Sequence, residues 1–165
     1  MKDTLVVYFS GNDAAKSKTA DAARNLASVT GADLYEITLQ NPYSKDFATV
    51  VKEAQRDKDA NARPALAGPS IDVKPYRTLI LGFPNWCGTA PMPVFSFLDE
   101  HMKDGSLAGT RIIPFVINDG SGMQDSVADL RIHYPELDIE EGEAFENNKL
   151  DNASLKAIDW IQELM

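Results

Sequence analysis

Apolar residues follow two alternating patterns along this chain, short unbroken runs and stripes at helical spacing. Unbroken runs of aliphatic, β-branched and aromatic residues are typical of strands that are buried on both faces of a parallel sheet. Such runs lie at residues 5–9, 79–83 and 112–117. Residues 33–37 alternate polar and apolar side chains, which predicts a half-exposed edge strand, and a weaker pattern predicts another strand near 139–144.

Stripes at helical spacing predict helices between these strands. Ala20, Ala23 and Leu26 share one face of the first stripe, and Gly31 follows it where a C-terminal cap belongs. The expected helices cover residues 19–30, 45–57, 91–102, 123–134 and 155 to 164 or 165. A polar connector rich in proline and alanine, residues 61–69, is interpreted as a surface crossover.

The alternation of strands and helices predicts the fold class. We expect an α/β fold with a doubly wound, five-stranded parallel sheet of order 2-1-3-4-5 between two layers of helices. The first and third strands are neighbours in that order, so the loops after Phe9 and Phe83 would meet at one crevice, flanked by the loop after Ile117. A single domain over residues 1–165 is expected, because neither side of the connector is long enough for a domain of its own.

Composition and charge exclude several classes of partner. The chain has 165 residues, a net charge of -9 and a pI near 4.6, which argue against nucleic acid and against an anionic membrane surface. No apolar stretch approaches the roughly 18 residues of a membrane span. Cys87 is the only cysteine and cannot form an internal disulfide, which favours a reducing compartment. We therefore expect a cytoplasmic protein whose acidic surface suits a basic partner protein.

The loop of residues 10–19 joins the first strand to the first helix and is rich in hydroxyl groups. A helix N-terminus binds anions through its free N–H groups and its dipole, so a phosphate site is one interpretation. The candidate groups are the hydroxyls of Ser10, Ser17 and Thr19 and the ammonium groups of Lys16 and Lys18. In the alternative interpretation Ser17 or Thr19 only caps the helix and the lysines are solvated.

Known nucleotide and phosphate motifs do not fit this loop. Ala15 stands where a Walker A loop needs a glycine before its lysine, and Gly11 is alone where a dinucleotide fingerprint needs three glycines. Phe9-Ser10 also lacks the acidic residues with which a receiver domain holds a metal ion.

The loop after Phe83 contains a tryptophan, a cysteine, a glycine and a threonine in succession. Trp86 is interpreted either as an aromatic wall for a planar ring or as a plug that fills space under the loop. Gly88 allows close backbone approach or a positive φ, and Thr89 is a candidate cap for the next helix. Cys87 is expected to pack rather than to act as a nucleophile, because no histidine lies near it in the sequence.

The loop after Ile117 reads Asp119-Gly120-Ser121-Gly122. Its exposed backbone N–H groups would suit the polar edge of a bound ring, and the alternative is a helix cap with a tight turn. His101 and His133 fall in predicted helices without partners at metal-ligand spacing, so no metal site is expected.

At these loops the chain resembles the flavodoxin-like family, in its short bacterial branch. The family segment Tyr-Pro-x-Trp-Trp-Gly-x-x-Pro is similar to Phe83-Pro84-Asn85-Trp86-Cys87-Gly88-Thr89-Ala90-Pro91, and a Gly-Gly-Ser-Gly loop is similar to Asp119-Gly120-Ser121-Gly122. Residues 6–10 and 31–37 resemble the family as well. The first loop departs from the family's Ser-x-Thr-Gly-Asn-Thr by an insertion, after which Lys18-Thr19 take the place of Asn-Thr.

The resemblance implies a noncovalently bound FMN. Its phosphate would lie on the loop of residues 10–19, and its isoalloxazine ring would lie between the Trp86 loop and the Gly120 loop. The implied binding residues are Ser10, Asn12, Lys16, Ser17, Lys18, Thr19, Pro84, Asn85, Trp86, Cys87, Gly88, Thr89, Asp119, Gly120, Ser121 and Gly122.

Three functional hypotheses follow. The first is an FMN-binding redox protein that transfers electrons to a basic redox partner protein or reduces a small acceptor such as a quinone. The second, favoured by the irregular first loop, is a flavodoxin-fold binding or regulatory module that has lost FMN or binds it weakly. The third, a nucleotide-binding or phosphotransfer domain, is opposed by the missing motifs. Under the first hypothesis Asp119 would disfavour an anionic reduced flavin, so Asp119→Asn is expected to raise the reduction potential.

Overall fold

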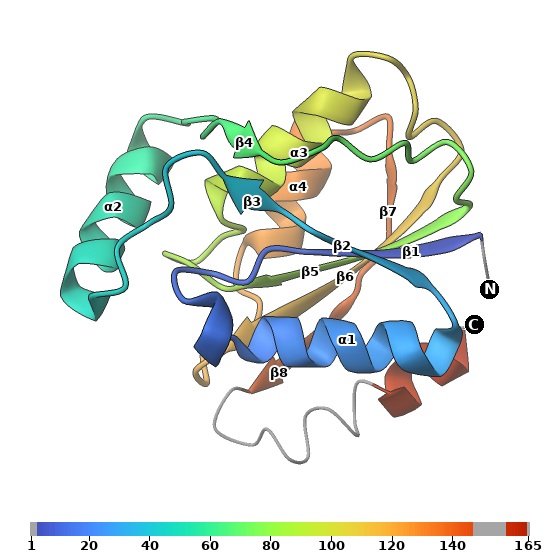
Figure 1. Ribbon diagram of the computed structural model, residues 1–165, viewed down its shortest axis with the longest axis horizontal. Helices are drawn as coiled ribbons and strands as arrows, with labels where there is room; N and C mark the ends of the chain where they lie inside the picture. Colours follow the sequence, from blue (N-terminus) through green and yellow to red (C-terminus); the bar gives the residue numbers. More distant parts are fainter. Residues whose placement is uncertain (1–2, 147–157, 165) are drawn as a thin grey trace.

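The computed structural model describes residues 3–146 and 158–164 (Figure 1). The strands of its main sheet are β1 (Thr4–Tyr8), β2 (Asp33–Glu36), β5 (Thr78–Pro84), β6 (Arg111–Asn118), β7 (Asp138–Ile139) and β8 (Glu143–Glu146). The helices are α1 (Lys18–Thr30), α2 (Phe47–Asp59), α3 (Met92–Met102) and α4 (Ser126–His133), and residues 158–164 are also helical. The predicted helices are thus present, except that residues 155–157 and 165 of the last one lie outside the described residues.

The main sheet is parallel and has the predicted order. β1 lies between β2 and β5, and β6 follows β5, with Tyr8 opposite Glu36 on one side and Gly82 on the other. β7 and β8 both pair with β6 and share the fifth position at the edge. Since β1 and β5 are neighbours, their carboxyl ends lie side by side, as the order 2-1-3-4-5 requires.

Pro114 accounts for the division of the edge strand into β7 and β8. The pairing of β7 stops at Ile112 opposite Ile139, and that of β8 starts at Phe115 opposite Glu143, so the proline stands at the interruption. Proline has no N–H to donate to a neighbouring strand. Gly142 adjoins the gap with φ of 71°, and a Cβ there would lie 2.3 Å from the Pro114 carbonyl oxygen. The edge strand expected over 139–144 is therefore bulged around this proline.

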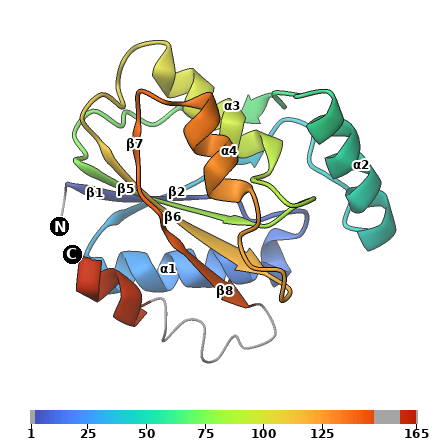
Figure 2. The same cartoon turned by 180° about the vertical axis from the view of Figure 1, so that it is seen from behind.

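Successive residues of β1 face opposite layers of the fold. Leu5 and Val7 belong to the core under α3 and α4, whereas Val6 and Tyr8 belong to the core under α1. Figures 1 and 2 show α1 and the helix of residues 158–164 on one face of the sheet and α3 and α4 on the other. Strands buried on both faces explain why the sequence has unbroken apolar runs instead of alternation.

α2 does not cover either face of the sheet. It lies beyond the carboxyl ends of the central strands in both views (Figures 1 and 2). The segments before and after α2 in the sequence pair with each other in a small antiparallel sheet, β3 (Thr38–Leu39) with β4 (Leu66–Ala67). This sheet was not predicted, and β4 lies inside the connector that we expected to be a surface crossover. This placement brings α2 next to the loops that follow β1, β5 and β6.

Candidate functional site

The three loops singled out in the sequence meet at the carboxyl edge of the sheet. A Cβ atom on Gly11 of the first loop would lie 3.7 Å from the side chains of Pro84 and Trp86 in the second. Asn85 of the second loop donates from Nδ2 to the Gly122 carbonyl of the third at 2.9 Å. Its backbone N–H also donates to the Ile117 carbonyl at 2.8 Å. The predicted convergence of the loops is confirmed.

Residues Trp86 to Thr89 form a tight hairpin turn. The two end residues exchange backbone hydrogen bonds at 3.0 and 3.1 Å, and the two central residues, Cys87 and Gly88, both have positive φ, 54° and 79°. Two consecutive left-handed residues are typical of a type I′ turn, whose first central position rarely holds a cysteine. The glycine serves the role expected of it, and the cysteine occupies a strained backbone position that the sequence did not reveal.

Thr89 does not cap the helix that follows it. α3 has Pro91 at its N-cap position and receives no side-chain cap there. The buried Thr89 hydroxyl instead donates to Asp129 of α4 at 2.5 Å. The expected capping role is wrong, because a carboxylate forty positions later in the chain lies within reach of the hydroxyl.

Trp86 packs against other aromatic rings and also lines a pocket, so both interpretations of this residue stay open. Its ring meets the rings of Phe9 and Tyr43 edge-on, with centroids 5.4 and 5.1 Å away. The side chain is nevertheless only half-buried and lines a pocket beside the loops. The aromatic contacts fix the orientation of the indole, and the rest of its surface faces the pocket.

The third loop is organised by Asn118 at the end of β6. The Asn118 Oδ1 atom accepts hydrogen bonds from the N–H groups of Gly120 and Gly122 at 2.8 and 3.0 Å. Its Nδ2 donates to the Phe145 carbonyl of β8 at 3.1 Å. Two of the N–H groups that we expected to be available to a ring edge are therefore used within the protein. Ser121 lies next to the second loop, with its hydroxyl oxygen 3.3 Å from the Asn85 Nδ2 atom.

The first loop meets the N-terminus of α1 as predicted, with some of its polar groups already engaged. The Ser17 hydroxyl accepts a hydrogen bond from the Ala20 N–H at 3.0 Å and caps the helix, and Thr19 is buried in the first turn. Asn12 donates from Nδ2 to the Ser44 carbonyl at 2.9 Å. Ser10 is half-buried, and Lys16 and Lys18 are exposed.

A pocket of about 520 Å³ lies between these loops and α2. Of the residues predicted to bind a cofactor, it is lined by Asn12, Pro84, Asn85, Trp86, Cys87 and Asp119. Ile117 and Asn118 form part of its lining at the end of β6. The other predicted residues lie on the adjoining loops or in the first turn of α1 and not in its lining.

The outer wall of the pocket comes from α2, which sequence analysis did not assign to the site. Phe47, Val50, Val51 and Ala54 line it at helical spacing, followed by Gln55. The same apolar stripe had predicted the helix, so the signal was present. A stripe indicates that a helix face is covered or lines a hollow, but it does not say which.

Several polar contacts attach α2 to the rest of the protein. Lys58 Nζ donates to the Cys87 carbonyl at 2.6 Å. The Tyr43 hydroxyl donates to Asp57 at 2.6 Å, and Glu53 accepts from the Ser44 N–H at 2.8 Å. These contacts join the helix to the hairpin turn and to the segment that precedes the helix.

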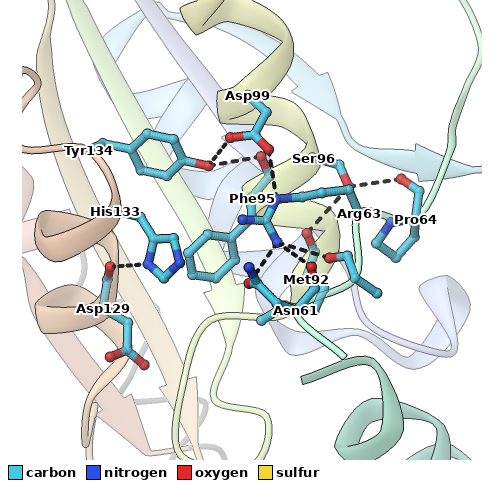
Figure 3. Close-up of polar contacts among 11 residues, drawn as sticks. Asn61, Arg63, Pro64, Met92, Phe95, Ser96, Asp99, Asp129, His133 and Tyr134 are labelled. Carbon is cyan, nitrogen blue, oxygen red and sulfur yellow. Dashed lines mark hydrogen bonds and ion pairs between the residues drawn. The ribbon is translucent and has the colours of Figure 1, made fainter. Parts of the chain in front are cut away.

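Arg63 anchors the chain just beyond α2 (Figure 3). Its Nε donates to Asp99 of α3 at 2.7 Å, and its guanidinium carbon lies 5.1 Å from the centre of the Phe95 ring. The Tyr134 hydroxyl, from the end of α4, donates to the same carboxylate at 2.6 Å and to the Phe95 carbonyl at 3.0 Å. The start of the connector is thus fixed on α3 and α4, which limits where α2 can lie.

Electrostatics agree with a packing role for Cys87. Burial raises the pKa of the Cys87 thiol, and the nearby Lys58 ammonium offsets this only in part. Burial and the hydrogen bond to Asp57 raise the pKa of Tyr43, so its hydroxyl stays protonated as a donor. Neither side chain is prepared for nucleophilic chemistry near neutral pH.

Within 3–146 and 158–164, no helix is both long and apolar enough to cross a lipid bilayer. The same part of the chain has no group of three or more histidine, cysteine, aspartate or glutamate side chains arranged to hold a metal ion.

Comparison with solved structures identifies several similar proteins. A provisionally named flavoprotein from Bacteroides eggerthii is 27% identical, with a TM-score of 0.80 over 98% of this chain and 97% of that one. Its counterpart from Bacteroides uniformis is also 27% identical, with a TM-score of 0.79 over 98% of each chain. A flavoprotein from Lactobacillus acidophilus, solved in complex with FMN, shares the fold at 20% identity, with a TM-score of 0.72 over 93% of this chain and 99% of that one.

Family comparison covers almost the whole sequence. No curated protein matches the chain. The family model Flavodoxin_4, described as flavodoxin, matches residues 3–164. The parallel sheet, its strand order and the three loops at its carboxyl edge agree with this match. The chain belongs to the flavodoxin family.

Proposed function

We propose that this chain is an FMN-binding redox protein and that FMN occupies the pocket between α2 and the three loops. The observation that carries the proposal is the pocket itself, about 520 Å³ in volume, at the carboxyl edge of the sheet between β1 and β5. Family membership and the FMN complex of the Lactobacillus acidophilus flavoprotein support it.

The residues around the pocket fit the parts of FMN. The N-terminus of α1 suits a phosphate, with Lys16 and Lys18 exposed beside it. Trp86 and the apolar face of α2 suit the two faces of a flat ring. Among the described residues no group donates to the buried Asn85 Oδ1 atom, which suits an N–H on the polar edge of the ring.

FMN, when bound, accepts and releases one or two electrons, and the protein supplies binding, orientation and charge. Trp86, held by Phe9 and Tyr43, would orient the ring, and Phe47 and Val51 would exclude water from its outer side. The net charge of -9 supports a basic protein as the redox partner. A small acceptor such as a quinone is the other candidate, because the α2 wall is apolar.

Titration of the purified protein with FMN, followed by quenching of flavin fluorescence, tests the proposal. We expect saturable quenching by one FMN per chain, and weaker binding of riboflavin because it lacks the phosphate that α1 would bind. Equal affinity for the two would contradict the phosphate site. Absence of quenching would contradict the whole proposal.

A colourless protein that FMN leaves unchanged would favour the second function, a binding or regulatory module of the same fold. The first loop supports this alternative, because Ser17 and Asn12 already have partners within the protein. Ser17 still has its hydroxyl proton and Asn12 a second Nδ2–H to donate, so these contacts restrict the approach of a phosphate to the two side chains without excluding it. NAD(P)H oxidation with and without a quinone would separate a reductase from an electron carrier.

Asp119 supplies a test of the electrostatics of the flavin-loaded protein. Its carboxylate lines the pocket and would repel the negative charge of a reduced flavin. Asp119→Asn removes that repulsion, so the reduction potential should rise by on the order of tens of millivolts. A redox titration against a reference dye measures the change, and an unchanged or lower potential would exclude the role.

A further inference from the structure

We propose that Lys58 is a positioning residue that fixes the Trp86–Thr89 turn and joins it to α2. The contact is a single hydrogen bond from Lys58 Nζ to the Cys87 carbonyl oxygen, 2.6 Å long. Cys87 lines the pocket, and Lys58 lies near the end of α2, the helix that forms its outer wall. The consequence for FMN affinity rests on the function proposed above. The positioning of the turn does not.

The turn needs an external partner because its backbone is strained. Cys87 has φ of 54°, a conformation that costs a residue with a side chain about 1–2 kcal/mol. The hydrogen bonds between Trp86 and Thr89 close the turn but leave its two central carbonyl groups to other donors. Strained backbone of this kind persists only where the surroundings hold it.

Each central carbonyl of the turn receives a hydrogen bond from a different element. Lys58 of α2 donates to Cys87, and the Asp125 N–H, just before α4, donates to Gly88 at 2.9 Å. The two donors approach from segments that are far apart in the sequence. Together they fix the orientation of both peptide groups, and only the α2 donor is a side chain that a substitution can remove.

The same contact sets the distance between two walls of the pocket. Cys87 and Trp86 line one side, and Ala54 and Gln55 of α2 line the other, one turn of helix before Lys58. α2 buries only Val50 and Ala54, so apolar packing holds it weakly. Loss of the Lys58 contact should therefore loosen both the turn and the adjacent part of the pocket.

The experiment compares Lys58→Met with Arg56→Met and Lys58→Arg. Arg56 also lies in the last turn of α2, so its replacement removes the same charge and the same helix-dipole interaction. Among the described residues, its ion pair is with Asp57 and not with the turn. Lys58→Arg keeps the charge and the donor groups. Both positions are exposed, so all three variants should fold.

Amide hydrogen exchange in the cofactor-free protein gives the first result. In Lys58→Met the Trp86 and Thr89 amides should exchange about three- to tenfold faster, because a hydrogen bond from a charged group is lost from a partly exposed site. Arg56→Met should leave these amides unchanged, and Lys58→Arg should restore most of the protection. Equal exchange in Lys58→Met and Arg56→Met would overturn the proposal.

FMN titration of the same variants gives the second result. Lys58→Met should bind FMN about three- to tenfold more weakly than wild type, and Arg56→Met should bind it normally. If wild type itself binds no FMN, the function proposed above fails, while the exchange result still decides the role of Lys58. If exchange changes as expected but all variants bind FMN equally, the turn is positioned by Lys58 without consequence for the cofactor, and that part of the inference is wrong.

Discussion

α1 and α2 have the same length but are held by different interactions. Each spans 13 residues and begins with a side-chain cap, Ser17 in α1 and Asp46 in α2. α1 buries six residues, with Leu26 fully enclosed, and packs on the sheet. α2 buries two, Val50 and Ala54, and turns part of its apolar face toward the pocket. An amphipathic helix can thus serve the core or a binding site, and its pattern alone does not distinguish the two.

The largest expected difference between the helices concerns stability. Leu26→Ala should lower the free energy of unfolding by about 2–5 kcal/mol, because it leaves a cavity in a fully buried position of α1. Val51→Ala in α2, where the side chain is 45% exposed, should change it by no more than about 0.5 kcal/mol. Urea unfolding followed by circular dichroism measures both. Similar losses in the two variants would mean that α2 is packed as firmly as α1.

The fold could be predicted where burial leaves a pattern in the sequence. The runs of β1, β5 and β6 are apolar on both faces because helices cover both sides of the sheet. The alternation of such runs with helical stripes predicts the parallel, doubly wound order. β3 and β4 are two residues long and leave no such pattern. The edge strand is split into β7 and β8 at the point where it lies opposite Pro114 of β6. Which residues lie opposite Pro114 depends on the pairing register, and the register cannot be deduced from the sequence of one strand alone.

The candidate site also has a part that could be predicted from the sequence and a part that could not. Trp86 is identifiable because a large aromatic residue is unusual in an exposed loop, and Gly88 and the 119–122 loop because glycines allow close backbone approach. The doubly wound order places these loops together. Contacts between segments far apart in the chain were not foreseeable. The Asn118 side chain accepts hydrogen bonds from two N–H groups that we expected to be available to a ligand. The Thr89 hydroxyl donates to Asp129 on α4 instead of capping α3.

The second prediction concerns ligand binding and compares exposed apolar side chains on the two helices. Phe47 is 77% exposed at the start of α2 and lines the pocket, whereas Val29 is 40% exposed on α1 and does not. Phe47→Ala should weaken FMN binding about fivefold, equivalent to about 1 kcal/mol of lost apolar contact, with little change in stability. Val29→Ala should leave affinity unchanged.

Fluorescence quenching measures both affinities, and thermal unfolding of the cofactor-free variants controls for loss of structure. If Phe47→Ala binds FMN as well as wild type while Lys58→Met binds it more weakly, α2 acts through its contact with the turn and not through its apolar face. If neither differs from wild type, FMN does not contact α2, and the comparison between the two helices is one of stability alone.

The smallest expected effect distinguishes the two N-terminal caps by pH. Hydrogen bonds from the Thr49 side chain and backbone hold the pKa of Asp46 below its ordinary value of 3.8. A lowered pKa in the folded state means that Asp46 stabilises α2 above its ordinary pKa and ceases to do so as the pH falls through the lower value. The Ser17 hydroxyl that caps α1 does not titrate in this range.

Amide exchange corrected for intrinsic rates, from about pH 5 to about pH 2, should therefore show earlier loss of protection at the start of α2 than in α1. Asp46→Asn keeps a good capping group but cannot titrate, so it should remove this acid-induced fraying. Fraying that persists in Asp46→Asn would contradict the assignment of this effect to the Asp46 cap.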